Sequence, residues 1–255
     1  MILLCAATLG EMDACLAAAG LRFGELEPRE APEKARGEAI AAALIGHRIW
    51  ARGRGGLLCA VTGVGIPLTL LRLLPLASRT APELIFNAGI AGAYPGSGLS
   101  IGDVVAGESE TFGDLGMETP GPETFLPLAS FPWADEDYRR PLPLALEPLR
   151  RGGRDGTPGL PVAGGCTINA CAGTEATGRL RRSRTGAGFE TMEGAAAALV
   201  GRELGIPVCE VRAISNIAST RDFRPAGAEM ALGNLGVYMG RWLAGLPGFG
   251  REGNA

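Results

Sequence analysis

The chain has 255 residues, of which 46% are apolar and 20% are charged, as is typical of a globular protein with one large α/β domain. The formal net charge at pH 7 is −3, and the densest basic cluster, at 179–184, contains no aromatic residue, which favours a solvated helix end over a nucleic-acid site. No apolar stretch approaches the roughly 18 residues of a membrane-spanning helix, and the N-terminal apolar run lacks the basic start of a signal peptide. We therefore expect a cytoplasmic protein with no membrane or nucleic-acid partner.

Short apolar runs alternate with helix-like stretches along the chain. The sequence predicts strands over 2–7, 57–61, 83–87, 104–106, 160–168 and 207–214, and helices over 11–19, 67–77, 194–204 and 226–246. Continuous apolar strands that alternate with helices are typical of a mostly parallel sheet covered on both faces. Because ligands of such sheets bind beyond the carboxyl ends of the strands, we expect functional residues at Glu11, 62–65, 87–92 and 215–216.

Residues 107–160 break this pattern, since they contain many prolines and glycines and few apolar repeats. We expect an irregular loop region here, inside a single domain that spans residues 1–255. The region holds Phe112, Phe125, Phe131 and Trp133, a large share of the aromatic residues. A long loop of this kind is either a lid or binding loop, or a connection anchored by a few aromatic side chains.

The cysteines and the histidine argue against two kinds of chemistry. None of the six cysteines forms a C-x-x-C pair and most lie in apolar runs, which favours buried reduced thiols over disulfides or zinc ligands. The only histidine, His47, has no cysteine or second histidine nearby. A Ser-His-Asp or metal mechanism would therefore depend on His47 alone, and carboxylates are the better candidates.

Two glycine-rich segments follow predicted strands. Thr62-Gly63-Val64-Gly65 opens a predicted helix and has the form of an anion-binding turn, although a tight strand-to-helix turn is the simpler explanation. Asn87-Ala-Gly89-Ile-Ala-Gly92 allows a close approach to the backbone. Neither segment has the G-x-G-x-x-G fingerprint of dinucleotide binding or the Gly-Lys-Ser/Thr of a P-loop.

Carboxylates gather at the predicted strand ends. Glu11 follows the first strand, Glu193 opens an alanine-rich helix, and Asn216 ends a strand six residues before Asp222. A single glutamate in a first helical turn is explained by the helix dipole. Several converging carboxylates without a nucleophile–histidine pair suit a reaction with an oxocarbenium-like transition state.

These segments, in this order, resemble the nucleoside phosphorylase and methylthioadenosine nucleosidase superfamily. The resemblance rests on Glu11, the segments 62–65 and 87–92, Ile101-Gly-Asp-Val-Val105, Met192-Glu193-Gly-Ala and Val211-Arg-Ala-Ile-Ser-Asn216. Within the superfamily the chain most resembles the futalosine hydrolases of the alternative menaquinone route. Thr167-Ile-Asn169, Gly173-Thr174-Glu175, Ser215-Asn216 and Arg221-Asp222 carry this narrower resemblance.

The resemblance implies a three-layer α/β/α sandwich around a central mixed, mostly parallel sheet. It also implies a purine nucleoside substrate, no cofactor or metal, and a homo-oligomer of two or more copies. Glu11 would activate water, Glu193 would hold the ribose and stabilise its positive charge, and Met192 would pack beneath the ribose. The other residues that it places near the substrate are Thr62, Gly63, Gly65, Asn87, Gly89, Gly173, Thr174 and Ser215.

Two departures from relatives narrow the expected reaction. Phosphorylases of the superfamily carry an arginine near position 87, where this chain has Asn87, and arginine is the natural phosphate partner. Adenine-releasing relatives carry an aspartic acid where this chain has Asn216, whose amide suits a 6-oxopurine. We therefore expect hydrolysis of futalosine to hypoxanthine and dehypoxanthine futalosine, with Asn216 or Asp222 assisting the base.

Three alternatives remain open at this stage. They are a methylthioadenosine or aminodeoxyfutalosine nucleosidase, a purine nucleoside phosphorylase, and a nucleoside-binding protein without activity. For the remainder of futalosine, which carries a carboxyphenyl ketone, the residues between Phe112 and Trp133 are candidates for an apolar slot. Arg221 or Arg224 is a candidate for the cation that would bind the carboxylate of this group.

Overall fold

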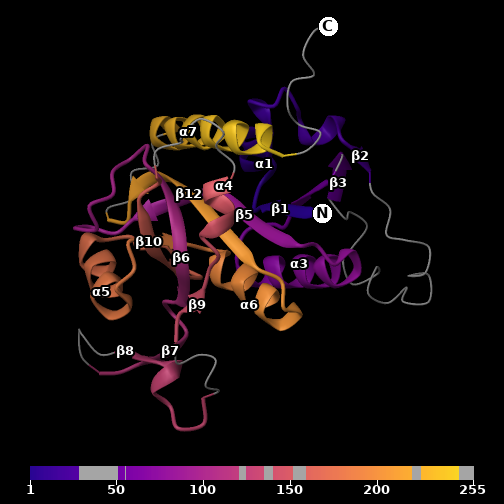
Figure 1. Cartoon of the computed structure of the whole chain (residues 1–255). Coiled ribbons are helices and arrows are strands. Elements are labelled where there is room, and N and C mark those ends of the chain that lie inside the picture. The colour runs from indigo at the N-terminus through magenta and orange to yellow at the C-terminus, as the bar shows by residue number, and fades with distance from the viewer. Residues whose placement is uncertain are drawn as a thin grey trace, which may run out of the picture.

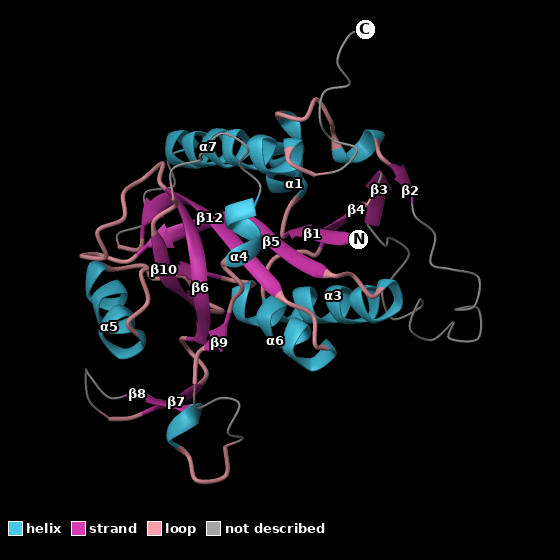
Figure 2. Cartoon of the chain, viewed as in Figure 1, coloured by secondary structure: helices cyan, strands magenta, loops and turns pink. Residues whose placement is uncertain are grey.

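The structure is a computed structural model that describes residues 1–28, 51–54, 56–120, 125–134, 140–151, 159–219 and 225–246. His47, Arg221, Asp222 and Arg224 lie outside these ranges, so the predictions made for them are not addressed by the structure. Figures 1 and 2 show a twisted sheet between two layers of helices. The expected three-layer α/β/α arrangement around a mixed sheet is thus confirmed.

The sheet is built mainly from parallel strands. Its order is β11-β10-β6-β12-β5-β1-β4-β3-β2. The bounds are β1 Ile2–Ala6, β2 Glu27–Pro28, β3 Ala51–Arg54, β4 Leu57–Val61, β5 Leu84–Ala93, β6 Val104–Phe112, β10 Val162–Thr167, β11 Phe189–Thr191 and β12 Val208–Ile217. Strand β12 is parallel to β5 but antiparallel to β6. Strand β11 pairs with both β10 and β5, so the strands from β5 to β11 close into a ring.

Helices cover both faces of the sheet. Helices α1 (Leu9–Ala17) and α7 (Pro225–Ala244) lie together on one face, and α3 (Ile66–Thr80) and α6 (Gly194–Leu204) lie together on the other (Figure 1). Helix α5 (Glu175–Thr185) lies beside β10, and α4 (Glu147–Arg151) is short. The remaining elements are the 3-10 turns η1 (Phe23–Glu25) and η3 (Leu128–Ser130) and the short strands β7 (Gly116–Glu118), β8 (Phe125–Pro127) and β9 (Leu142–Pro143). No helix within the described ranges is long and apolar enough to cross a membrane.

The core is divided by the sheet into two apolar layers. Successive side chains of β1 point to opposite faces, so Leu4 packs with Phe86 and Trp242 under α1 and α7, while Leu3 packs with the α3 and α6 side. The Phe86 and Trp242 rings meet edge to face, with their centroids 4.4 Å apart. Burial on both faces explains why the central strands are continuous apolar runs.

Three strands are longer than the sequence predicts. Residues 87–92 belong to β5, because β5 continues to pair with β12 and then with β11 after β1 has ended. Residues 107–112 likewise belong to β6, paired with β10, rather than to the irregular region. Asn216 lies within β12, after a register shift at 214–216. The predicted helix end at 179–184 lies in α5, whose start was not predicted because the helix has no apolar periodicity; it begins at the Thr174 cap and ends at Gly186.

Candidate active site

Glu11 lies in the first turn of α1, just beyond the end of β1. Thr8 caps α1 and forms a capping box with Glu11, whose Oε2 accepts hydrogen bonds from the Thr8 backbone N–H (2.9 Å) and hydroxyl (2.8 Å). Its Oε1 accepts a hydrogen bond from the Ile90 backbone N–H at 3.0 Å. Ile90 lies beyond the last residue of β5 that pairs with β1. Glu11 therefore does more than cap its own helix: it also satisfies a backbone donor of β5.

Glu193 is held by groups outside its own helix. It occupies the N-cap position of α6 but makes no side-chain cap to that helix. Its Oε1 accepts a hydrogen bond from the Gly65 backbone N–H at 2.9 Å, and its Oε2 lies 3.7 Å from Arg212 Nη1. Burial raises the pKa of Glu193, and the charges of Glu11 and Glu210 act in the same direction, whereas Arg212 and the Gly65 N–H oppose the rise. Helix-dipole complementarity alone does not account for this carboxylate.

Arg212 connects the acidic residues of the site and is itself 0% exposed. Glu210, Arg212 and Ile214 alternate with apolar residues along β12, so their side chains share one face. The guanidinium lies 2.8 Å from Glu210 Oε1 through both Nε and Nη2. Both Arg212 Nη1 and Glu11 Oε1 come so close to Gly89 that an added Cβ there would lie 2.5 and 2.6 Å from them. Gly89 therefore makes room for both side chains.

The two glutamates open into one cavity of about 290 Å³. Its walls come from the ends of β1, β5, β11 and β12, the segment after β10, the start of α1, the turn before α3, and α7. The lining residues include Ala7, Thr8, Gly10, Glu11, Val64, Ile90, Ala91, Gly92, Ile168, Cys171, Glu190, Thr191, Met192, Glu193, Ser215, Asn216 and Leu232. Of the predicted site residues, Glu11, Met192, Glu193, Ser215 and Asn216 meet here.

Asn216 and Glu190 form a polar part of the cavity wall. An added Cβ at Gly92 would lie 3.1 Å from Asn216 Nδ2 and 3.4 Å from Glu190 Cγ, so the two side chains face the same glycine. Asn216 Oδ1 accepts a hydrogen bond from the Ser215 hydroxyl at 2.9 Å. The Glu190 carboxylate accepts from the Ala172 N–H (3.0 Å) and lies 3.3 Å from Arg181 Nη1. Burial is the main cause that raises the pKa of Glu190.

The other predicted substrate contacts lie behind or beside the cavity. Gly65 donates its N–H to Glu193, and Thr62 donates its hydroxyl to the Ala6 carbonyl, 3.3 Å away. Gly63, with φ of 88°, makes room for Leu68 and Arg72. The Asn87 side chain is directed into the core, where its Nδ2 donates to Glu210 Oε1 at 3.0 Å.

The predicted contacts at Gly173 and Thr174 do not line this cavity either. Thr174 is the N-cap of α5, and its hydroxyl accepts a hydrogen bond from the Thr177 N–H at 3.1 Å. Gly173 is exposed and has no atom within 4 Å of an added Cβ. Their sequence pattern thus marks the start of a helix in this structure.

Two site residues were not singled out from the sequence. Arg212 lies within one of the quoted motifs but was given no role, and Glu190 was given none either. The available signal was the placement of charged residues within otherwise apolar strands, since such residues are rarely buried unless they are paired. Within the described ranges, no three His, Cys, Asp or Glu side chains gather as a metal site requires.

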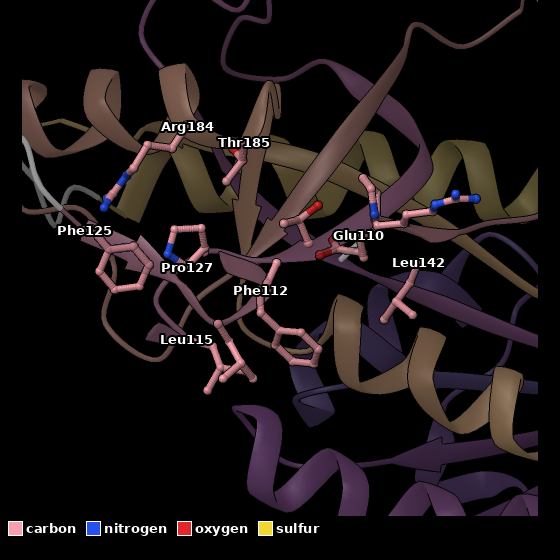
Figure 3. Close-up of a pocket in the computed structure, with 14 residues that line it drawn as sticks. Glu110, Phe112, Leu115, Phe125, Pro127, Leu142, Arg184 and Thr185 are labelled. Carbon is pink, nitrogen blue, oxygen red and sulfur yellow. The ribbon is translucent and has the colours of Figure 1, made fainter. Parts of the chain in front are cut away.

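Two of the four aromatic residues of the predicted irregular region, Phe112 and Phe125, line a second cavity, of about 520 Å³, between β6, the β7–β8 pair and the end of α5 (Figure 3). In Figure 3, Phe125 and Arg184 lie on one side of this cavity and Glu110 and Leu142 on the other. The Arg184 guanidinium lies 4.7 Å above the centre of the Phe125 ring. Trp133, which stacks on Phe131, is 73% exposed. The two cavities share no lining residue.

Comparisons with known proteins show the family of this chain. Residues 13–234 match the family model described as the phosphorylase superfamily. A futalosine hydrolase of Thermus thermophilus is 35% identical over 183 residues, which cover 72% of this chain and 79% of that protein.

Two solved structures share the fold. That of a futalosine hydrolase mutant of Helicobacter pylori has a TM-score of 0.71 and 15% identity, covering 96% of this chain and 99% of the other. That of a 5′-methylthioadenosine/S-adenosylhomocysteine nucleosidase of S. pneumoniae with a transition-state inhibitor has a TM-score of 0.67 and 16% identity, with the same coverage. On the family match and the Thermus relative, the chain belongs to the phosphorylase superfamily and, within it, to the futalosine hydrolase family.

Proposed function

We propose that this protein hydrolyses the N-glycosidic bond of futalosine and releases hypoxanthine. The observation that carries the proposal is the pair of buried carboxylates, Glu11 and Glu193, that open into one cavity whose wall also contains the amide of Asn216. Two carboxylates with an amide suit a reaction in which positive charge develops on a sugar and negative charge on a leaving base. Membership of the futalosine hydrolase family supports the choice of substrate.

In the proposed reaction, the oxygen of a water molecule bonds to C1′ of the sugar as the bond from C1′ to N9 of the purine breaks. The bonding electron pair leaves with the purine. Glu11 takes one proton from the water, and the base takes up one proton, so that the products are the free base and a sugar with a 1′-hydroxyl. The proton on Glu11 then returns to solvent, which restores the carboxylate.

Glu11 is suited to the role of base because its carboxylate is fixed without being fully occupied. A carboxylate offers about four lone-pair positions, and three donors, two from Thr8 and one from Ile90, reach the two oxygens. One position is left for water. The three donors fix the orientation of the group before substrate binds, which is the condition for efficient proton transfer.

Glu193 is suited to stabilise the sugar. The Gly65 N–H, before α3, and Arg212, of β12, each hold one of its two oxygens. The carboxylate therefore stays fixed as positive charge develops on the ribose. The attraction between this fixed carboxylate and the sugar is stronger in the transition state, where the sugar is positively charged, than in the ground state. We propose that Met192, which lines the same cavity, packs against the ribose.

The leaving purine is assigned to the side of Asn216. An amide carries two N–H donors, so Asn216 Nδ2 can donate to a purine oxygen while its other hydrogen is held by the Ile217 carbonyl at 3.1 Å. A 6-oxopurine such as hypoxanthine offers acceptors of this kind. The proton that the base takes up comes from solvent when Asn216 alone assists the base. Asp222, which lies outside the described ranges, is the alternative source of that proton.

Water is favoured over phosphate as the nucleophile on electrostatic grounds. Glu11 and Glu193 present negative charge to the cavity, and like charges at short range repel. Among the described residues, Arg212 beside Glu193 is already paired with Glu210. Arg181 is likewise paired with Glu190. Asn87, at the position where phosphorylases carry an arginine, is directed toward Glu210 and away from the cavity.

A panel of nucleosides tests the proposal. Purified enzyme is incubated with futalosine, inosine, methylthioadenosine and aminodeoxyfutalosine, with and without phosphate, and the released bases are separated by chromatography. We expect hypoxanthine from futalosine at a rate that is independent of phosphate. Preferential release of adenine would favour the adenine nucleosidase alternative, and a rate that requires phosphate would favour a phosphorylase. Binding of futalosine without any base release would indicate a nucleoside-binding protein.

We further infer that the protein acts in the cytoplasm as a homo-oligomer and that residues 1–255 form a single domain. An assembly is supported by exposed leucines on α3, since Leu68, Leu71 and Leu74 are 39%, 46% and 41% exposed, and apolar surface of this kind favours association. A reducing compartment is supported by the free thiols of all six cysteines. Light scattering coupled to size-exclusion chromatography tests the assembly.

A further inference from the structure

Two carboxylic acids lie in the centre of the sheet, away from the cavity of Glu11 and Glu193. Glu110 of β6 and Glu210 of β12 are both 0% exposed. Both reach toward Gly194, the first residue of α6, where an added Cβ would lie 2.8 Å from Glu210 Oε1 and would also collide with Glu110 Oε1. The proposed reaction does not use either group, although burying an acid is costly unless it is paired or neutral.

Glu210 is hydrogen-bonded at one oxygen only. Its Oε1 accepts from Arg212 Nε at 2.8 Å and from Asn87 Nδ2 at 3.0 Å. Among the described residues, no N–H or hydroxyl donates to its buried Oε2. A buried carboxylate oxygen without a donor is destabilising, so a donor of another kind is needed there.

Glu110 is placed to be that donor. Oε1 of Glu110 and Oε1 of Glu210 crowd the same position beside Gly194, so the two carboxyl groups are neighbours. Burial, followed by the charge of Glu210 and a hydrogen bond with it, raises the pKa of Glu110 well above its usual value. The Thr167 hydroxyl, 2.7 Å from Glu110 Oε2, and Arg212 act in the opposite direction. Two carboxyl groups that share a hydrogen bond require one proton between them.

Building on the proposed function, we propose that Glu110 is a neutral carboxylic acid that donates its proton to Glu210, and that this carboxyl pair positions Arg212 against Glu193. Glu210 keeps its negative charge and holds the Arg212 guanidinium at 2.8 Å. Arg212 Nη1 then faces Glu193 Oε2 at 3.7 Å. Glu110 and Glu210 are positioning residues, because they act on the reaction only through Arg212 and Glu193.

The same pair also fixes the start of α6. The Thr167 hydroxyl gives its hydrogen to Glu110 and accepts the Ala195 N–H at 2.7 Å, while the Thr191 hydroxyl accepts the Gly194 N–H at 3.2 Å. These N–H groups belong to the first turn of the helix that begins directly after Glu193. Glu193 is thus held both through Arg212 and through the helix that it opens.

Two substitutions of Glu110 distinguish the effect of its hydrogen-bond donor from the effect of its size. In Glu110→Gln the amide replaces the acid O–H as donor to Glu210 and keeps an acceptor for Thr167, whereas Glu110→Met keeps the length and removes both. For hypoxanthine release from futalosine, we expect kcat of Glu110→Gln to stay within about twofold of the wild type. We expect kcat of Glu110→Met to fall about tenfold or more, with KM within about threefold, as for lost positioning in the transition state.

Thermal denaturation provides a measurement that needs no substrate. Among the described residues, the titratable and charged groups around Glu110 are Glu210, Arg212 and Cys166, and Arg140 and Arg184 line the same cavity as Glu110. Because the pKa of Glu110 is raised in the folded state, its contribution to stability is fully present below its unfolded pKa and is lost as pH rises toward the folded value. The amide introduced by Glu110→Gln does not titrate. We therefore expect the melting temperature of the wild type, relative to Glu110→Gln, to fall by about 3 °C per pH unit as pH rises from the unfolded pKa toward the raised folded pKa.

Glu108→Gln and Glu108→Met are the matched controls, since Glu108 lies on the same strand and is exposed; we expect neither to change kcat or the pH dependence of melting. The proposal is overturned if Glu110→Gln loses as much kcat as Glu110→Met, or if folded Glu110→Met keeps wild-type kcat. A melting difference between the wild type and Glu110→Gln that is constant with pH also overturns it. Should the wild type release no hypoxanthine, the proposed function fails, and the melting comparison still decides whether Glu110 is neutral.

Discussion

The two cavities of this molecule contrast in how their walls are built. The smaller one lies where β1 ends and β5 continues, so that backbone donors such as the Ile90 and Gly65 N–H groups are free to hold Glu11 and Glu193. The larger one is walled mainly by apolar side chains, with Arg140 and Arg184 among its lining residues. Under the proposed function the reaction belongs to the smaller cavity, so carboxylates fixed by backbone donors are a better guide to it than size or aromatic content. Substitutions in the two cavities should therefore differ in effect.

The largest effect is expected at the two cavity carboxylates. Glu193→Gln keeps an oxygen for the Gly65 N–H but removes the charge beside the sugar, and Glu11→Gln removes the proposed base. We expect each to lower kcat about 10²-fold or more, the usual scale for such losses, with the melting temperature little changed. Steady-state release of hypoxanthine measures this. Glu175→Gln, on the exposed face of α5 where Glu175 pairs with Arg179, is the control, and near wild-type turnover in both cavity variants would remove the mechanism.

The next largest effect is expected from Gly89→Ala. The new methyl group would lie 2.5 Å from Arg212 Nη1 and 2.6 Å from Glu11 Oε1, closer than the contact distance of nonbonded atoms. Both side chains must then move, so we expect kcat to fall about tenfold or more, because small displacements of catalytic groups are costly. Gly233→Ala, where the added Cβ of a helical residue meets no atom within 4 Å, is the matched control and should retain full activity. Equal kinetics for the two variants would contradict the assigned geometry.

These two predictions differ in how far the sequence could supply them. Glu11 and Glu193 follow predicted strands, and parallel strand ends meet at one edge of a sheet, so their convergence was predictable. The role of Gly89 was not, because it depends on β5 continuing past the end of β1 and on Arg212 of β12 crossing over it. The segment 87–92 looks like a turn by composition, and only pairing with β12 and β11 makes it a strand. Tertiary pairing of this kind overrides local propensity.

The pairing of Glu110 with Glu210 likewise could not be predicted from the local sequence around either residue. Glu210 is the only acid of β12 and Glu110 shares β6 with the exposed Glu108. Nothing in the local pattern says that β6 and β12 bring Glu110 and Glu210 together. The layers of the fold, in contrast, follow from continuous apolar runs that retain their meaning without knowledge of neighbours. The layers of the fold can therefore be predicted from local sequence pattern, whereas the arrangement of the site depends on the order in which the strands pair.

A third prediction concerns the choice of base. Asn216→Asp replaces an amide donor by a carboxylate or a carboxylic acid, at a wall shared with Glu190. Since a carboxylate cannot donate to a purine oxygen and a carboxylic acid can protonate a purine nitrogen, we expect the ratio of hypoxanthine release to adenine release to fall by about tenfold, worth about 1.4 kcal/mol. Competition between futalosine and aminodeoxyfutalosine, followed by chromatography, measures the ratio. An unchanged ratio would move base recognition away from Asn216.

A fourth, smaller effect is expected in the pH dependence of the reaction. The pKa of Glu193 is raised, chiefly by burial, and the proposed role requires the ionised form. Activity should therefore rise with pH through a value above the ordinary range of a glutamate, near 4.5, and the acidic limb of kcat/KM reports it. The measurement is a pH–rate profile at constant ionic strength. An acidic limb at or below the ordinary value would show that Glu193 ionises as if exposed to water.

The smallest effect is expected in the larger cavity, and there a null result is informative. Phe125→Leu removes the ring beneath the Arg184 guanidinium and leaves the carboxylate cavity untouched, so kcat for inosine should stay within about twofold of the wild type, as for most changes away from a site. Inosine lacks the extended part of futalosine, and comparing KM for the two nucleosides therefore measures whether that part reaches this cavity. Equal KM ratios in the wild type and the variant mean that the extended part binds elsewhere. A rise in KM for futalosine alone would instead join the two cavities in one binding site, in which the aromatic residues recognise the substrate and the carboxylates cleave it.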